Sequence, residues 1–132
     1  MTGAPVIAFV PAHDSERARD FYVDVIGLRF VRDDGFAMVC ESGGTMVRIV
    51  DAADFTPQPF TVLGWEVADI HAEVARLTGA GVTFEDFALA EDGVVWNAPG
   101  GDAIAWFRDS EGNLLSISQH AFPVSNPAPP RE

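Results

Sequence analysis

The same series of structural signals occurs twice along this chain of 132 residues. Each half carries an aspartate suited to cap a helix, apolar residues at helical spacing, a glycine that can end the helix, and an aromatic residue in a strand-like run. These positions are Asp14, Gly27 and Phe30 in the first half and Asp69, Gly81 and Phe84 in the second. Because the two series agree in spacing to within one residue, we predict one supersecondary unit that is used twice.

The first unit is predicted to contain a strand, a helix and three further strands. An apolar run that ends at Pro11 is typical of a buried strand, and the helix after it repeats apolar residues on one face. Turns rich in aspartate and glycine separate the later strands. The predicted strands cover residues 6–10, 28–32, 36–41 and 45–50, and the helix runs from 14 to 27.

The second unit repeats this order after a linker that contains two prolines. A helix is predicted to start after Asp69, and strands are predicted at 60–67, 82–84, 94–97, 103–107 and 114–118. We therefore expect one domain at 1–122, with module one at about 5–51, a linker at 52–59 and module two at about 60–120. Residues 123–132 hold four prolines and are predicted to form a disordered tail.

The segment 106–119 predicts a β-hairpin. Turn formers fill residues 109–113, and Gly112 can take a positive φ there at no steric cost. The sequence alternates after the turn, so its side chains are predicted to point to two opposite faces. The core-facing set is Leu115 and Ile117, and the opposite set is Leu114, Ser116 and Ser118.

Composition limits the partners and the location that we expect. Twenty acidic residues against eight arginines give a formal net charge of −12, which repels a phosphate backbone and disfavours nucleic acid as a partner. We interpret this acidity as a source of solubility, with attraction of a cationic small molecule as the alternative.

The uncharged runs are too short to span a membrane and the N-terminus lacks a signal-peptide pattern, so a cytoplasmic protein is expected. The single cysteine, Cys40, is expected to be a buried hydrophobe.

Two motifs together resemble the vicinal oxygen chelate superfamily. They are Asp14-Ser-Glu-Arg-Ala-Arg-Asp-Phe-Tyr-Val-Asp-Val-Ile-Gly-Leu28 in the first unit and Asp109-Ser-Glu-Gly-Asn-Leu-Leu115 in the second. The superfamily includes glyoxalase I, extradiol dioxygenases, fosfomycin resistance enzymes and bleomycin-binding resistance proteins, and the resemblance covers about residues 5–120. It implies an α+β fold in which two tandem βαβββ modules form a curled mixed sheet with a concave cavity. It also implies a homodimer.

The resemblance also locates the positions that hold a divalent metal ion in metal-dependent relatives. Here those positions correspond to Ile7, Arg48, Val62 and Ser116. None of the four is a carboxylate or an imidazole, and a divalent ion needs several converging nitrogen, oxygen or sulfur donors. We therefore expect no metal and no cofactor.

A cavity between such strands would be lined by apolar and aromatic residues with few polar groups, as small-molecule sites are. The candidate ligand-binding residues are Ile7, Phe9, Met46, Arg48, Val62, Trp96, Trp106, Leu114, Ser116 and Ser118. Arg48 is expected to clamp an anion or, as the favoured alternative, to form a salt bridge with Glu66 or face solvent. Each tryptophan has a buried structural role as its alternative.

The three histidines show no spacing that would form a metal set or a catalytic pair. His13 precedes the first helix, His71 lies in the first turn of the second, and His120 begins the tail. A solvated or locally bonded imidazole is favoured for each. We therefore identify no catalytic residue.

The leading hypothesis is a metal-independent protein that binds an apolar or aromatic small molecule, similar to the drug-sequestering members of the superfamily. A drug or a metabolite is the expected ligand class. One alternative is a divalent-metal-dependent lyase or dioxygenase of the same superfamily. Another is a dimeric interaction module without catalytic activity.

Overall fold

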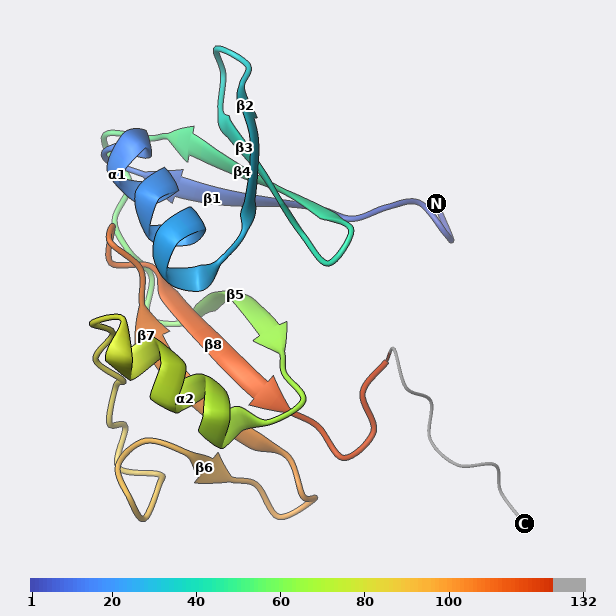
Figure 1. Cartoon of the computed structure of the whole chain (residues 1–132), viewed down its shortest axis with the longest axis vertical. Helices are drawn as coiled ribbons and strands as arrows, with labels where there is room; N and C mark the ends of the chain where they lie inside the picture. The colour runs from blue at the N-terminus through green and yellow to red at the C-terminus, as the bar shows by residue number, and fades with distance from the viewer. Residues whose placement is uncertain (125–132) are drawn as a thin grey trace. The chain divides into compact units, whose positions relative to one another are not determined.

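The computed structural model describes residues 1–124, and the predicted tail lies outside the described residues from position 125 onward (Figure 1). The first module runs in the predicted order of strand, helix and three strands. Its elements are β1 (Ile7–Ala12), α1 (Ser15–Asp20), the π-helical segment η1 (Phe21–Ile26), β2 (Arg29–Asp33), β3 (Met38–Ser42) and β4 (Thr45–Asp51). The strands form one sheet in the order β1-β4-β3-β2. β1 is parallel to β4, and the other neighbours are antiparallel.

The first helix begins and ends at the predicted residues. The side chain of Asp14 caps it by accepting a hydrogen bond from the backbone N–H of Arg17 at 3.1 Å. Gly27 ends it with φ = 100°, a conformation that favours glycine. Its second half departs from a regular α-helix because the N–H groups of Gly27 and Leu28 both donate to the carbonyl of Tyr22, at 3.0 and 2.9 Å. The bond from Gly27 reaches back five residues instead of four, and this spacing widens the last turn into a π-helix.

The second module has the same order and its own four-stranded sheet. Its elements are β5 (Thr61–Glu66), α2 (Ile70–Gly79), β6 (Trp96–Asn97), β7 (Ala103–Arg108) and β8 (Leu114–Gln119), and the strand order is β5-β8-β7-β6. The Asp69 side chain caps α2 by accepting from the backbone N–H of Ala72 at 3.1 Å. The prediction of an α+β fold with two βαβββ modules is confirmed. No helix within residues 1–124 is long and apolar enough to cross a membrane.

Two predicted strands of this module are shorter than expected. The strand at 82–84 is reduced to an isolated bridge between Phe84 and Phe107. The strand at 94–97 keeps only its last two residues. Between them, side-chain carboxylates of Asp86 and Asp92 accept backbone N–H bonds from residues two and three positions further on. The turn at Asp92 uses the N–H groups of Val94 and Val95, which a longer strand would have given to the sheet. The N–H of Val82 donates instead to the carbonyl of Leu77 at the end of α2, at 3.0 Å.

Each sheet has one buried face and one face that is more exposed. In the first sheet Val10, Val47 and Ile49 are buried, and α1 packs against β3 and β4. We call the opposite faces the first open face and the second open face. The first carries Ile7, Phe9, Met46 and Arg48, and the second carries Val62, Gly64, Glu66, Trp106, Ser116 and Ser118. Cys40 is buried, and burial raises the pKa of its thiol, as expected of a structural residue.

Contacts divide the chain into two compact units. Residues 1–63 form the first together with Arg108–Leu114, which contains the β7–β8 turn. Residues 64–107 form the second together with residues 115–124 of the described chain. The linker packs within the first unit, where Phe55 stacks on His13 at a ring distance of 4.2 Å. The alternation of buried and exposed residues along the strands thus leaves one face of each sheet open for a site.

Candidate functional site

The four positions that the resemblance predicts to correspond to metal ligands carry side chains poorly suited to a metal. Ile7 lies on β1, Arg48 on β4, Val62 on β5 and Ser116 on β8. Isoleucine and valine offer no lone pair and a guanidinium repels a cation, so these residues do not fit a divalent ion. Within residues 1–124, no group of three or more His, Cys, Asp or Glu side chains is arranged to hold a metal.

Arg48 forms an ion pair on the first open face. Its Nη2 lies 2.9 Å from Oδ2 of Asp34, which belongs to the β2–β3 turn. The other oxygen of Asp34 accepts the backbone N–H groups of Phe36 and Ala37, and these bonds and Arg48 lower the pKa of Asp34 despite partial burial. A salt bridge was the favoured alternative for Arg48, but its partner is Asp34 and not Glu66. A ligand anion at Arg48 would compete with this carboxylate.

The rest of the first open face is apolar. Sheet register pairs Ile7 with Met46 and Phe9 with Arg48. Phe9 is 64% exposed and Ile7 is 46% exposed, whereas Met46 is half-buried. These residues therefore present a small apolar surface beside Arg48, whose charge is balanced by Asp34.

Three aromatic side chains form a cluster in the second module. The rings of Trp96 and Trp106 are nearly parallel, with centroids 6.2 Å apart and an interplanar angle of 26°. Phe87 meets the ring of Trp106 edge-on at 5.6 Å. Both tryptophans are half-buried and Phe87 is 44% exposed. This aromatic cluster, Phe87, Trp96 and Trp106, offers flat apolar surface to a ligand.

Small polar side chains lie beside the aromatic cluster. The backbone bond from Asp109 N–H to the carbonyl of Asn113 sets the register of the hairpin, which places Ser116 across from Trp106. Ser118 is half-buried on the same face of β8, whereas Leu114 is buried. Two hydroxyl groups thus lie next to aromatic surface on the second open face.

Gly64 keeps this face open at the neighbouring strand. A Cβ atom at position 64 would lie 2.6 Å from Oγ of Ser116 and 3.3 Å from its carbonyl oxygen. A Cβ atom there would force the hydroxyl of Ser116 to move and would press on its carbonyl oxygen, so glycine suits the close approach of the strands. Gly64 is not among the residues predicted for the site, although its place in the alternating series Val62, Gly64, Glu66 is a signal for it.

His13 and His120 each contact other residues. Nδ1 of His13 lies 3.0 Å from the carbonyl oxygen of Ala53, in addition to its stacking on Phe55. Nδ1 of His120 contacts Oε1 of Glu66, and the backbone N–H of His120 donates to Oε2 at 2.9 Å. Glu66 chiefly accounts for the raised pKa of His120. Glu66 and His120 are 54 positions apart in the sequence, and no local motif predicted their pairing.

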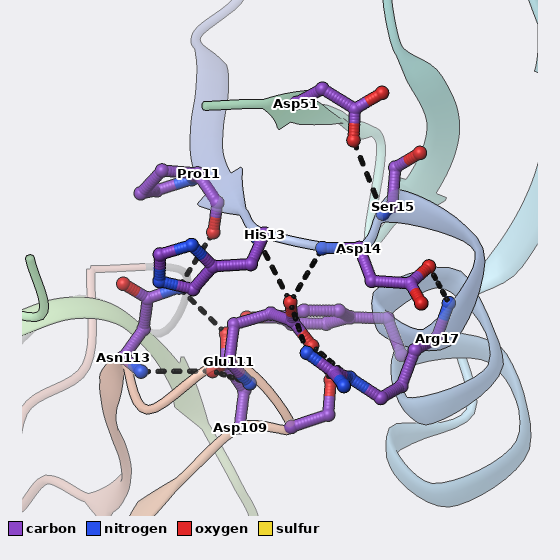
Figure 2. Close-up of polar contacts among 11 residues, drawn as sticks. Pro11, His13, Asp14, Ser15, Arg17, Asp51, Asp109, Glu111 and Asn113 are labelled. Carbon is purple, nitrogen blue, oxygen red and sulfur yellow. Dashed lines mark hydrogen bonds and ion pairs between the residues drawn. The ribbon is translucent and has the colours of Figure 1, made fainter. Parts of the chain in front are cut away.

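A second polar cluster lies between the β7–β8 turn and the start of α1 (Figure 2). Oε1 of Glu111 accepts the backbone N–H groups of His13 and Asp14, each at 2.9 Å. Arg17 closes a two-point ion pair, with Nε 2.8 Å from Oε2 and Nη2 3.0 Å from Oε1. Ser110 donates to Oε2 at 2.8 Å. We call these contacts the Glu111 brace.

The turn beside the Glu111 brace is held by buried bonds of its own. Tyr22 donates its hydroxyl hydrogen to Oδ2 of Asp109 at 2.6 Å. Asn113 donates to the same oxygen and to the carbonyl of Pro11, both at 2.9 Å. Burial, followed by the charge of Asp109, raises the pKa of Tyr22 well above its usual value. The side chains of Tyr22, Asp109 and Asn113 are buried, so this turn is structural and these three residues offer a ligand no accessible group.

The brace also determines the ionisation of its carboxylate. Burial alone would raise the pKa of Glu111, but hydrogen bonds from Arg17, Asp14 and Ser110 outweigh it and lower the pKa from 4.5 to about 2. The side chain of Glu111 has no exposed surface. The carboxylate therefore remains charged, and its charge is matched by Arg17 of α1 and by N–H and O–H donors from His13, Asp14 and Ser110.

Comparison with known proteins is consistent with this geometry. The sequence model of the "Glyoxalase/Bleomycin resistance protein/Dioxygenase superfamily" matches residues 5–117. TnmS3, an antibiotic binding protein from Streptomyces sp. CB03234, is 26% identical, and the alignment covers 90% of this chain and 97% of that one with a TM-score of 0.70. A glyoxalase/bleomycin resistance protein from the same strain is 27% identical, with coverage of 88% and 100% and a TM-score of 0.65.

More distant structures show the fold alone. Lactoylglutathione lyase from Agrobacterium tumefaciens is 20% identical, with 89% of this chain and 93% of that chain covered and a TM-score of 0.69. No curated protein matches the sequence. An enzyme and an antibiotic binding protein thus share this backbone, so the side chains of the open faces must distinguish between the two kinds of function.

Replacing the buried carboxylate should weaken the fold in a pH-dependent way. We expect Glu111→Gln to lower the free energy of unfolding at pH 7 by about 2 to 3 kcal/mol, because the charge-assisted bonds from Arg17 and from the backbone N–H groups of His13 and Asp14 are weakened. The pKa of Glu111 is lowered in the folded state, so its contribution is complete above about pH 4.5 and is lost as pH falls toward 2. Urea denaturation between pH 3 and 7 measures this.

The control is Glu91→Gln, which removes an exposed carboxylate from a loop of the second module. It should change the free energy of unfolding by less than about 0.5 kcal/mol at every pH. An equal effect of the two substitutions would contradict the role given to the Glu111 brace.

A methyl group at position 64 should disturb the second open face. We expect Gly64→Ala to destabilise the protein by about 1 kcal/mol, because its Cβ overlaps the hydroxyl of Ser116. Adding Ser116→Ala should restore most of this loss, since it removes the overlapping oxygen. Gly100→Ala is the matched control, as nothing lies within 4 Å of its Cβ position. Thermal melts of the four proteins measure the effect, and failure of the double variant to recover would contradict the contact.

Proposed function

The chain belongs to the glyoxalase/bleomycin resistance protein/dioxygenase superfamily, and from this membership we propose that it binds an apolar or aromatic small molecule without a metal ion. The ligand lies against the second open face and stacks on the aromatic cluster. Sequestration of a drug or metabolite is the proposed role. The observation that carries this proposal is the partly exposed pair of parallel rings, Trp96 and Trp106, beside the hydroxyl of Ser116.

The chemistry of the aromatic cluster supports a flat ligand. Two rings at an angle of 26° present faces of similar orientation, and Phe87 adds an edge to one of them. Stacking against aromatic side chains contributes roughly 0.5 to 1.5 kcal/mol beyond the burial of apolar area. Ser116 and Ser118 supply the few hydrogen-bonding groups that orient a ligand in a mostly apolar site.

The donor set supports binding without a metal. A lyase or dioxygenase that acts through a divalent ion needs oxygen or nitrogen ligands, and Ile7 and Val62 provide none. TnmS3 binds an antibiotic according to its description, and its 26% identity extends over nearly the whole chain. We propose an antibiotic-like aromatic compound as the ligand class on this basis.

The first open face has a secondary part in the proposal. Ile7, Phe9 and Met46 give it apolar surface, and Arg48 is available to a ligand anion only in competition with Asp34.

We also propose the homodimer that the family resemblance implies, supported by the exposure of Phe9 and Ile7. Sedimentation equilibrium tests this state, and a monomer at high protein concentration would contradict it.

Ligand binding should quench tryptophan fluorescence. We expect planar aromatic antibiotics to quench the emission of Trp96 and Trp106, and Trp106→Ala to weaken binding by about tenfold, because stacking surface is lost. Phe36→Ala is the control, since Phe36 is 84% exposed in the first module and lies outside the aromatic cluster. A panel of planar antibiotics that leaves the fluorescence unchanged, or equal effects of the two variants, would contradict the proposal.

The metal content of the protein tests the proposal that the ligand is bound without a metal ion. Protein purified without chelator should contain far less than one divalent ion per chain by elemental analysis, because the four corresponding positions lack suitable donors. Antibiotic affinity should be the same before and after treatment with a chelator. Stoichiometric metal, or affinity that depends on it, would favour the lyase or dioxygenase alternative.

A further inference from the structure

A separate pocket lies at the end of the β5 strand, away from the aromatic cluster. It has a volume of about 450 Å³ and is lined by Glu66, His120 and the segment Phe122–Val124. In the strand order β5-β8-β7-β6, two strands separate Glu66 on β5 from Trp96 on β6. The pocket therefore lies apart from the aromatic cluster of the proposed antibiotic site.

Glu66 fixes the orientation of His120 within this pocket. One oxygen accepts the backbone N–H of His120 at 2.9 Å, and the other contacts Nδ1 of the same residue. A carboxylate can only accept a hydrogen bond, so Nδ1 carries the hydrogen. In the neutral imidazole Nε2 is then a hydrogen-bond acceptor, and it is the ring nitrogen left for a ligand.

The electrostatic surroundings of the pocket favour a cationic ligand. Glu66 from β5 and Asp102 from the segment before β7 both act on His120. Asp102 is held nearby by accepting the backbone N–H of Ala121 at 2.9 Å. No arginine lines the pocket, and the whole chain has a net charge of −12, which attracts cations.

The remaining walls of the pocket are apolar. Phe122 is 63% exposed, and Pro123 and Val124 line the pocket beside it. An apolar group placed against them would remove this surface from water, which is favourable. The site thus combines one imidazole acceptor, negative charge and apolar walls.

We propose that this pocket binds an apolar amine in its protonated form, which donates a hydrogen bond to Nε2 of His120 while its apolar body packs against Phe122–Val124. Glu66 is a positioning residue, because it holds the ring and fixes which nitrogen faces the ligand. The site does not depend on the aromatic cluster or on the proposed antibiotic function.

Binding of the amine in this pocket should weaken as pH is lowered. When His120 is protonated, both ring nitrogens are donors and the ring repels an ammonium group. Affinity for the amine therefore falls as pH is lowered through the pKa of His120, which lies above its usual value because of Glu66 and Asp102. The amine itself remains protonated over this range, so the change comes from the protein.

The probe is 2-phenylethylamine, compared with phenylacetate, which has the same ring and the opposite charge. Calorimetric titration of the full chain should give at least about tenfold tighter binding of the amine at pH 8.5 than at pH 5.5. His120→Gln should weaken binding at pH 8.5 and remove the pH dependence. Glu66→Gln should weaken binding and move the midpoint to lower pH. His71→Gln is the matched control and should change neither.

Two further measurements separate this site from the antibiotic site. Trp106→Ala should leave amine binding unchanged, and His120→Gln should leave antibiotic quenching unchanged, so each proposal can fail without the other. Histidine ring resonances in NMR spectra should show that the amine shifts His120 and not His71. Tighter binding of phenylacetate than of the amine, no amine binding at either pH, or an unaltered pH profile in His120→Gln would overturn the proposal.

Discussion

One buried carboxylate connects two segments that are nearly a hundred residues apart. Glu111 has no exposed side-chain surface, and it accepts the backbone N–H groups of His13 and Asp14, just before helix α1, together with the guanidinium of Arg17. A charge without these partners would be too costly to bury, and the N–H groups without it would lack an acceptor. The β7–β8 turn and the helix start therefore require each other, and Asp109 and Asn113 complete the contact within the same compact unit.

Groups that satisfy each other in this way are not available for chemistry. The pKa values of Glu111 and Tyr22 are strongly shifted, and such shifts often mark a functional site. Here the shifts come from burial and from hydrogen bonds within the fold, and Arg17, a partly exposed partner of Glu111, already forms a two-point ion pair with it. The side chains of the aromatic cluster are only partly buried, and they present apolar surface to a ligand. The pocket at His120 presents apolar walls and a ring nitrogen for a hydrogen bond.

Local physics made much of the fold predictable. Capping by Asp14 and Asp69, the positive φ of Gly27 and Gly112, and alternation along the strands depend on neighbours in sequence, and the structure agrees with each. The prediction failed where local alternatives compete with a sheet. Asp92 accepts the N–H groups of Val94 and Val95, and the carbonyl of Leu77 accepts that of Val82, so the predicted strands at 94–97 and 82–84 are shortened. The π-helical end of the first helix likewise has no sequence signal in this chain.

The sequence alone determined the repeated module, the direction in which each strand residue faces, and the chemistry of the positions that hold a metal in relatives. These follow from backbone geometry and from the presence or absence of lone pairs. Only the tertiary structure decided which distant side chains meet: Arg48 with Asp34, Glu66 with His120, and Trp96 with Trp106. Strand pairing and loop path bring these residues together, and neither is encoded within a few residues of the side chains involved. For this reason the pocket at His120 could not be located from the sequence.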